Sequence, residues 1–259
     1  MKVAILSDEK IMASVAADTV EAVCTANPHA VLGLATGSSP LALYRELIER
    51  HRAGRIDFAQ SRSFNLDEYV GLPAGHPESY IEFIRRNFTD LVDLPAAEVH
   101  VPEGNASDPH AAAAAYDRAI RDAGGIDIQV LGIGSDGHIG FNEPGGSLAS
   151  RTHVGFLTEQ TRRDNARFFD GDVEKVPTHC ITQGLGTIME SRHAVLLATG
   201  ENKAEAVHQL VEGGISARWP ATVLQSHPDL LVVLDEAAAS QRELADFYRE
   251  VWSEETGTR

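Results

Sequence analysis

The chain has 259 residues, 43% of them hydrophobic, which is enough for one large α/β domain or two small domains with a buried core. Its formal net charge of −16 makes binding to a nucleic-acid backbone or an anionic membrane surface electrostatically unfavourable. The two cysteines, Cys24 and Cys180, are far apart and in no metal-like spacing, which is typical of reduced thiols in a reducing compartment.

Short apolar runs alternate with helical patterns along the chain. The runs predict strands near residues 2–6, 30–35, 62–66, 98–101, 126–134, 193–198 and 230–234. The clearest helical patterns lie near residues 9–25, 41–54 and 108–124. Near-continuous apolar strands are typical of a parallel sheet that is covered on both faces. We therefore expect a single α/β domain over residues 1–259, with a doubly wound, mostly parallel sheet and helices on both faces.

Polar capping residues and prolines mark the predicted helix starts. These starts are Ser7-Asp8-Glu9, Ser39 followed by Pro40, Pro77, and Asp108 followed by Pro109. The N-terminal stretch "MKVAILSDEK" has an apolar run that is too short for a signal peptide, and no apolar stretch of the chain is long enough to span a bilayer. We expect a soluble cytoplasmic protein.

Residues 152–182 depart from the strand–helix pattern. The stretch "TEQTRRDNARFF" predicts a polar, basic helix with poor apolar periodicity, and "DGDVEKVP" follows it. One interpretation is a small mobile cap that acts as an active-site lid; the alternative is a surface excursion without function.

Two loops that follow predicted strands are suited to an anion. In "TGSSP", backbone N–H groups at a helix start and the hydroxyls of Thr36, Ser38 and Ser39, together with Gly37, could bind phosphate. The alternative is an ordinary capping turn. In "TGENK", Lys203 stands at another helix start, where a cation opposes the helix dipole unless an anion compensates. Arg167 in the cap segment could complete the phosphate site.

Asp67 directly follows the strand at 62–66. In a partly dehydrated pocket, a carboxylate has a raised pKa and can remove a proton from a carbon next to a carbonyl. The alternative is a turn or capping aspartate. We expect Glu68 to point elsewhere and assign it no role.

The loop "LGIGSDGHIGFNEPGG" (131–146) places Asp136, His138 and Glu143 among glycines. They are too close together for a serine-hydrolase triad, and no G-x-S-x-G precedes them. A metal site would want a second histidine nearby, so we expect no metal. Carboxylates beside an imidazole fix its orientation and raise its basicity, which suits a proton shuttle. The alternative is a histidine bonded within its own turn.

Several long motifs together resemble the glucosamine-6-phosphate deaminase family. They are "GLATGSSP", "FNLDEYVGLPAGHPESY", "GIGSDGHIGFNEPGGSLASRTHV", "GLGTIMES", "TGENKAEAV" and "WPATVLQSHP", and the likeness extends to about residue 235. The resemblance implies a Rossmann-like α/β fold and the conversion of glucosamine 6-phosphate and water to fructose 6-phosphate and ammonia. It implies no cofactor and no metal.

The same resemblance implies roles for individual residues. His138 would open the sugar ring with help from Asp136 and Glu143, and Asp67 would accept the carbon-bound proton. The phosphate would be held by Thr36, Gly37, Ser38, Ser39, Arg167 and Lys203. Two alternatives are a 6-phosphogluconolactonase-like hydrolase and a non-catalytic sugar-phosphate sensor. The partner is then a small sugar phosphate, and a homo-oligomer is possible because the family includes monomers and hexamers.

The chain departs from the family at one point. Some hexameric deaminases are activated by N-acetylglucosamine 6-phosphate, which binds between subunits through basic side chains just after "SLASRT". Here the stretch reads "HVGFLT", with His153, Gly155 and Phe156 where cations and hydroxyls are wanted, and only Arg151 remains. We expect this effector site to be lost.

Overall fold

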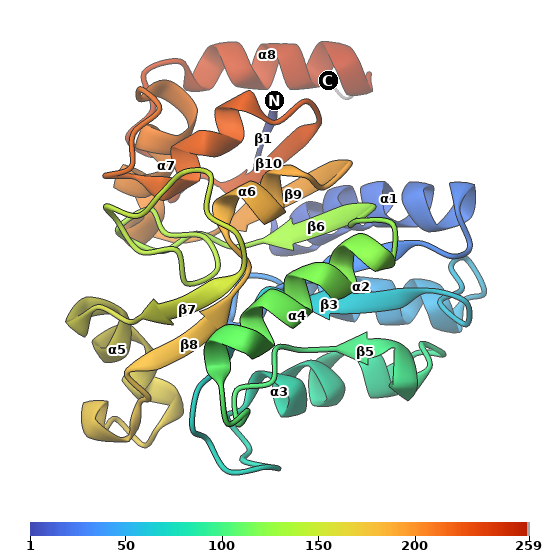
Figure 1. Cartoon of the computed structure of the whole chain (residues 1–259). Helices are drawn as coiled ribbons and strands as arrows, with labels where there is room; N and C mark the ends of the chain where they lie inside the picture. Colours follow the sequence, from blue (N-terminus) through green and yellow to red (C-terminus); the bar gives the residue numbers. More distant parts are fainter. Residues whose placement is uncertain (258–259) are drawn as a thin grey trace.

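A large parallel sheet and a small antiparallel sheet organise the computed structural model, which describes residues 1–257 (Figure 1). The large sheet has the strand order β1-β10-β9-β6-β2-β3-β5, and each neighbouring pair is parallel. Its strands are β1 (Lys2–Leu6), β2 (Val31–Leu34), β3 (Arg62–Asn65), β5 (Val99–His100), β6 (Ile128–Leu131), β9 (His193–Ala198) and β10 (Leu230–Asp235). The mostly parallel α/β sheet that the sequence predicts is confirmed.

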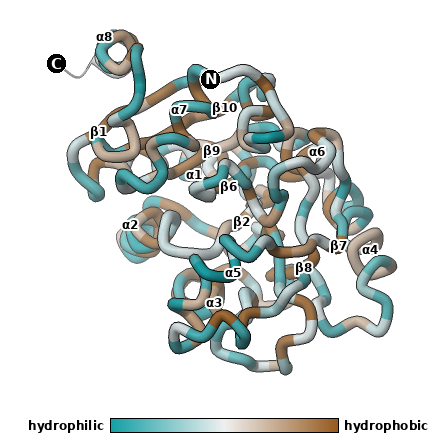
Figure 2. Tube along the Cα trace, turned by 90° about the vertical axis from the view of Figure 1, so that its left-hand side faces the viewer, coloured by the Kyte–Doolittle hydropathy of each residue, from teal (hydrophilic) through white to brown (hydrophobic). Residues whose placement is uncertain are grey.

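Helices cover both faces of this sheet. Figures 1 and 2 place α4 and α6 on one face and α1 and α2 on the other. The α-helices are α1 (Glu9–Ala26), α2 (Leu41–Arg52), α3 (Tyr80–Asn87), α4 (Pro109–Asp122), α5 (Glu159–Asn165), α6 (Leu185–Met189), α7 (Ala204–Glu212) and α8 (Ala245–Thr256). Every residue of β2 and of β6 is buried, as expected for central strands between two helical layers.

The order of the strands reverses between β2 and β6. From β2 the chain proceeds outward through β3 to β5, and from β6 it proceeds the opposite way through β9 to β10. Loops that leave two neighbouring strands in opposite directions open a crevice at the carboxyl ends of those strands. The loops after β2 and β6 are "TGSSP" and "GIGSDGHIGFNEP", so the fold brings two of the predicted functional loops together.

The small sheet has the order β4-β8-β7 and is antiparallel. Its strands are β4 (Asp67–Tyr69), β7 (His153–Phe156) and β8 (His179–Thr182). Asp67, which the sequence places just past a predicted strand, therefore begins a short strand of its own, and β7 and β8 are the two ends of the predicted cap segment. Between them lie α5 and two 3₁₀ helices, η3 (Ala166–Phe168) and η4 (Val173–Lys175). Figure 1 shows this segment projecting from the large sheet.

The predicted helix starts are correct where the capping residue directly precedes the helix in the sequence. Asp8 caps α1 and Asp108 caps α4, and each accepts two backbone N–H groups. Two other expectations are wrong. The helix expected at Pro77 begins at Tyr80, and Ser39 is not the cap of α2, because Pro40 occupies the N-cap position with helical backbone angles. Within residues 1–257 no helix is long and apolar enough to cross a membrane.

Candidate active site

The crevice at the strand reversal is a cavity of about 330 Å³. The loops after β2, β6 and β9 form its floor, together with the start of β4. Side chains of α3, of α5, of η3 and of Phe169 just after η3 complete the wall. Eight of the predicted site residues line it: Thr36, Gly37, Ser38, Ser39, Asp67, His138, Arg167 and Lys203. Asp136 and Glu143 flank His138 without lining the cavity themselves.

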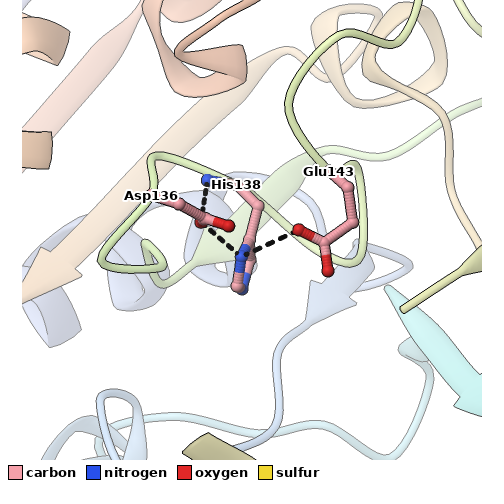
Figure 3. A group of neighbouring side chains, drawn as sticks. All are labelled: Asp136, His138 and Glu143. Carbon is pink, nitrogen blue, oxygen red and sulfur yellow. Dashed lines mark hydrogen bonds and ion pairs between the residues drawn. The ribbon is translucent and has the colours of Figure 1, made fainter. Parts of the chain in front are cut away.

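His138 is held between two acids (Figure 3). Its Nδ1 lies 2.7 Å from Asp136 Oδ1 and 3.8 Å from Glu143 Oε2. Asp136 Oδ1 also accepts the backbone N–H of His138 at 3.2 Å. The Nδ1–Oδ1 contact is short but poorly aligned for a hydrogen bond, so we describe it as an ion pair.

The two acids decide the protonation of the imidazole. Burial lowers the pKa of His138, but Asp136 and Glu143 outweigh it, so the pKa is raised above its usual value. For Asp136, burial acts to raise the pKa, but the contacts with His138 prevail and lower it. The loop therefore favours a charged or readily protonated histidine beside an ionised carboxylate.

Gly134 makes room for this histidine. A Cβ atom at Gly134 would lie 2.3 Å from Cε1 and Nδ1 of His138, closer than van der Waals contact allows. The imidazole thus packs directly on the backbone where β6 runs into its loop. This close approach explains one of the glycines that crowd the loop.

Asp136, His138 and Glu143 are also the group best placed to hold a metal ion among residues 1–257, since their ligand atoms lie within 4.8 Å of one another. Two atoms that share a tetrahedral zinc ion lie roughly 3.4 Å apart, given bonds of about 2.0–2.2 Å. The 2.7 Å separation of Nδ1 and Oδ1 is shorter than this. The geometry fits an ion pair better than a pair of metal ligands.

Asp67 lies on β4 with its carboxyl group at the cavity and only 5% of its surface exposed. Burial, reinforced by the negative charge of Glu68, raises the pKa of Asp67 to about 8, while His138 opposes the shift. A Cβ atom at Gly140 would lie 3.3 Å from Asp67 Oδ2, so the His138 loop passes close to this carboxyl group. Asp67 is a buried carboxyl group suited to exchange a proton near neutral pH.

The cavity wall also carries positive charge. Arg167 on η3 reaches across to the loop after β2, where its Nη2 lies 3.5 Å from Ser38 Oγ. Lys203 stands at the start of α7, and burial lowers its pKa although Asp164 and Asp136 oppose this effect. Two cations, three hydroxyl groups and the backbone of the 36–39 loop can hold a phosphate here.

The sequence interpretation missed several residues of the cavity wall. Tyr69, Tyr80 and Phe169 form an aromatic side, with Tyr69 4.8 Å from Tyr80 and 5.7 Å from Phe169 between ring centroids. The Tyr69 hydroxyl accepts a hydrogen bond from Asn165 Nδ2 at 3.0 Å, which ties α5 to β4. The aromatic residues inside the motifs "DEYVG", "PESY" and "ARFF" were the available signal.

The chain is similar in sequence to a known protein family. The model of a family described as glucosamine-6-phosphate isomerases/6-phosphogluconolactonase matches residues 7–232. A protein of Mycolicibacterium smegmatis named glucosamine-6-phosphate deaminase is 62% identical over 252 residues, covering 97% of each chain. One of Beutenbergia cavernae with the same name is 58% identical over 253 residues, covering 98% of this chain and 97% of the relative.

Solved structures agree. One described as a monomeric glucosamine-6-phosphate deaminase has a TM-score of 0.91 and 42% identity, covering 93% of this chain and 100% of its own. A 6-phosphogluconolactonase of Trypanosoma cruzi has a TM-score of 0.75 and 24% identity, covering 93% of this chain and 96% of its own. At that identity the second likeness shows the shared fold alone.

The buried carboxyl group of Asp67 should make stability depend on pH. In the unfolded chain this group loses its proton near pH 4, whereas in the fold it keeps the proton to about pH 8. The folded state therefore loses relative stability as pH rises through this window, by up to about 1.4 kcal/mol per unit. An asparagine side chain does not titrate, so we expect Asp67→Asn to gain stability over the wild type between these limits. Urea unfolding of both proteins from pH 4 to 9 measures the difference; a constant difference would contradict the raised pKa.

Proposed function

The chain belongs to the family of glucosamine-6-phosphate isomerases and 6-phosphogluconolactonases, and on that premise we propose that it deaminates glucosamine 6-phosphate. The products are fructose 6-phosphate and ammonia. The observation that supports this best is that one cavity is lined by two separately placed proton-transfer groups, Asp67 and His138, and by two cations suited to a phosphate, Arg167 and Lys203. Ring opening and carbon-acid chemistry need protons moved at different atoms, which two groups can do.

His138 acts first in the proposed reaction. The substrate enters as a closed pyranose, so a proton must leave the anomeric hydroxyl and another must reach the ring oxygen. Asp136 and Glu143 both lie next to Nδ1 and raise the pKa of the imidazole. This leaves Nε2 to take the proton from one oxygen and deliver it to the other.

Asp67 acts on the opened chain. The C1 aldehyde acidifies the hydrogen on C2. The Asp67 carboxylate removes it while O1 takes up a proton, which gives an enolamine. The same carboxyl group returns the proton to C1, which leaves an iminium at C2. Water adds to C2, and ammonia and one proton leave, so the ketone forms and the proton taken up at O1 is balanced. The raised pKa of Asp67, about 8, makes its carboxylate a stronger base than an exposed aspartate.

The phosphate site supplies binding energy away from the reacting carbons. Thr36, Gly37, Ser38 and Ser39 offer N–H and hydroxyl donors, and Arg167 and Lys203 supply charge. Holding the phosphate fixes C1 and C2 between Asp67 and His138. No cofactor is needed in this scheme.

We also propose that the cap segment is a lid over the active site. Residues 152–182 carry Arg167 and Phe169 into the cavity wall, which supports a lid that closes on the sugar phosphate. Slower amide exchange over 159–169 when fructose 6-phosphate is bound would test the lid.

Both cysteines are free and buried, which supports a cytoplasmic location. Association into a homo-oligomer stays a prediction.

Activity assays distinguish the proposed deaminase from two alternatives, a lactonase and a non-catalytic sensor. A lactonase would hydrolyse 6-phosphogluconolactone and would need no base that removes a carbon-bound hydrogen. A sensor would bind sugar phosphate without turnover. Ammonia and fructose 6-phosphate released from glucosamine 6-phosphate, with little lactone hydrolysis, would support the proposed function; the reverse result would overturn it.

The substitution Asp67→Asn should stop the carbon-acid step. It keeps size and polarity but removes the base, so kcat should fall by roughly 10²–10⁴-fold, and exchange of the C2 hydrogen with solvent should stop. In the wild type, kcat/KM should rise with pH through about 8, because only the deprotonated Asp67 is a base. Steady-state kinetics and deuterium exchange followed by NMR check both points. Near-normal exchange in the variant would assign the base to another residue.

Replacing either cation of the phosphate site should weaken binding of the phosphorylated sugar. For Lys203→Ala or Arg167→Ala we expect KM to rise about 10- to 100-fold, the effect of losing roughly 1.5–3 kcal/mol from a charged hydrogen bond. Unphosphorylated glucosamine, a poor substrate, should be little affected. Arg163→Ala is a matched control, because Arg163 lies on α5 but pairs with Glu159 at the surface. Equal effects on both sugars would indicate a structural role.

The expected loss of the effector site is supported by the surroundings of Arg151. Its guanidinium is already bound by Asp117 at 3.1 Å and by Glu190 at 2.6 Å. Phe156 on β7 is 65% exposed and offers no charge. We expect hyperbolic kinetics that N-acetylglucosamine 6-phosphate leaves unchanged. Substrate titration at about pH 7 with and without this compound is the check. A sigmoid curve that becomes hyperbolic would refute the expectation.

A further inference from the structure

Glu68 is a buried acid next to Asp67 that the proposed mechanism does not use. It is 6% exposed and lies on β4, outside the cavity wall. Its carboxylate accepts three backbone N–H groups. Oε1 accepts from Tyr69 at 2.8 Å and from Tyr80 at 3.0 Å, and Oε2 accepts from Ile81 at 3.0 Å. A carboxylate with three such donors on two elements has a fixed position.

These bonds set the start of α3. The residue at the N-cap position, Ser79, makes no capping bond with its side chain. Glu68 instead satisfies the first two N–H groups of the helix, those of Tyr80 and Ile81, from a neighbouring strand. Tyr80 lines the cavity and stacks on Phe141 with ring centroids 5.9 Å apart. The place of an aromatic wall residue thus depends on the Glu68 carboxylate.

The surroundings of Glu68 also affect its charge. Burial raises the pKa of Glu68, while the three N–H donors and the positive end of α3 act in the opposite direction and favour the ionised form. Glu82 on α3 is a second acid that faces it.

That charge bears on Asp67. Glu68 reinforces burial in raising the pKa of the Asp67 carboxyl group, and His138 opposes both. The other titratable groups that face Asp67 have pKa values raised by burial and are neutral near pH 7. They are Tyr69, Tyr80, Tyr116 and Cys180.

We propose that Glu68 is a positioning residue for the carbon-acid step: it fixes Tyr80 in the cavity wall and holds a negative charge beside Asp67 that makes Asp67 a stronger base. This inference rests on the proposed function. Glu68 does not touch the reacting atoms in this scheme. It acts through its two neighbours, one by geometry and one by charge.

The test separates charge from position with two substitutions. In Glu68→Gln the amide oxygen can still accept from Tyr69 and Tyr80, but the charge is gone. The acid limb of kcat/KM should then move to lower pH by on the order of one unit, and kcat at high pH should fall because the base is weaker. In Glu68→Asp the charge stays but the shorter side chain loses reach. The limb should stay near its wild-type pH while KM rises.

Glu82→Gln is the matched control, because it removes a neighbouring acid that is not bonded to the start of α3; we expect wild-type kinetics. A ¹³C NMR titration of the Asp67 carboxyl group in the free protein reads the same shift without substrate. An unchanged limb and an unchanged Asp67 titration in folded Glu68→Gln would overturn the inference. If Glu68→Gln does not fold, Glu68→Asp decides, and wild-type kcat and KM in that variant would overturn it. Absence of deamination by the wild type would instead refute the proposed function.

Discussion

In a parallel sheet, the chain that connects one strand to the next must cross a face of the sheet back to the edge where the strands begin. This constraint determines where the site lies. Because all strands of the large sheet point the same way, the loops that follow them emerge at one edge. Where the order reverses, between β2 and β6, those loops diverge and leave a cavity at the edge of the sheet. The 36–39 loop and the His138 loop lie on the two sides of that reversal. Packing of the sheet, rather than any attraction between the loops, brings them together.

At the site, the surroundings of two aspartates shift their pKa values in opposite directions. Asp67 is buried beside another acid, and its pKa is raised; Asp136 is paired with an imidazole, and its pKa is lowered. One carboxyl group can therefore carry a proton near neutral pH while the other remains charged. Lys203 is similarly affected by burial, which lowers its pKa. The fold assigns these properties through the depth of each group and the charge of its nearest neighbour.

The parts of this arrangement that depend on neighbouring residues in sequence could be predicted. The apolar strands, the Asp108 cap and the convergence of polar loops at one sheet edge follow from local pattern and from the rules of parallel sheets. The start of α3 could not be predicted, because its cap, Glu68, lies twelve residues before Tyr80 on a separate strand. The strand character of β4 was hidden for a similar reason, since its partner is β8. Contacts between distant segments leave no periodicity in the sequence.

The pairing of β4 with β8 has a consequence for biosynthesis. Asp67 lies opposite Thr182, more than a hundred residues further along the chain. A ribosome that has released only the first half of the protein has delivered the 36–39 loop and Asp67 but not the strand that pairs with β4. The small sheet can close only after β8 emerges, so the surroundings of Asp67 are completed late in folding, by a contact between distant parts of the chain.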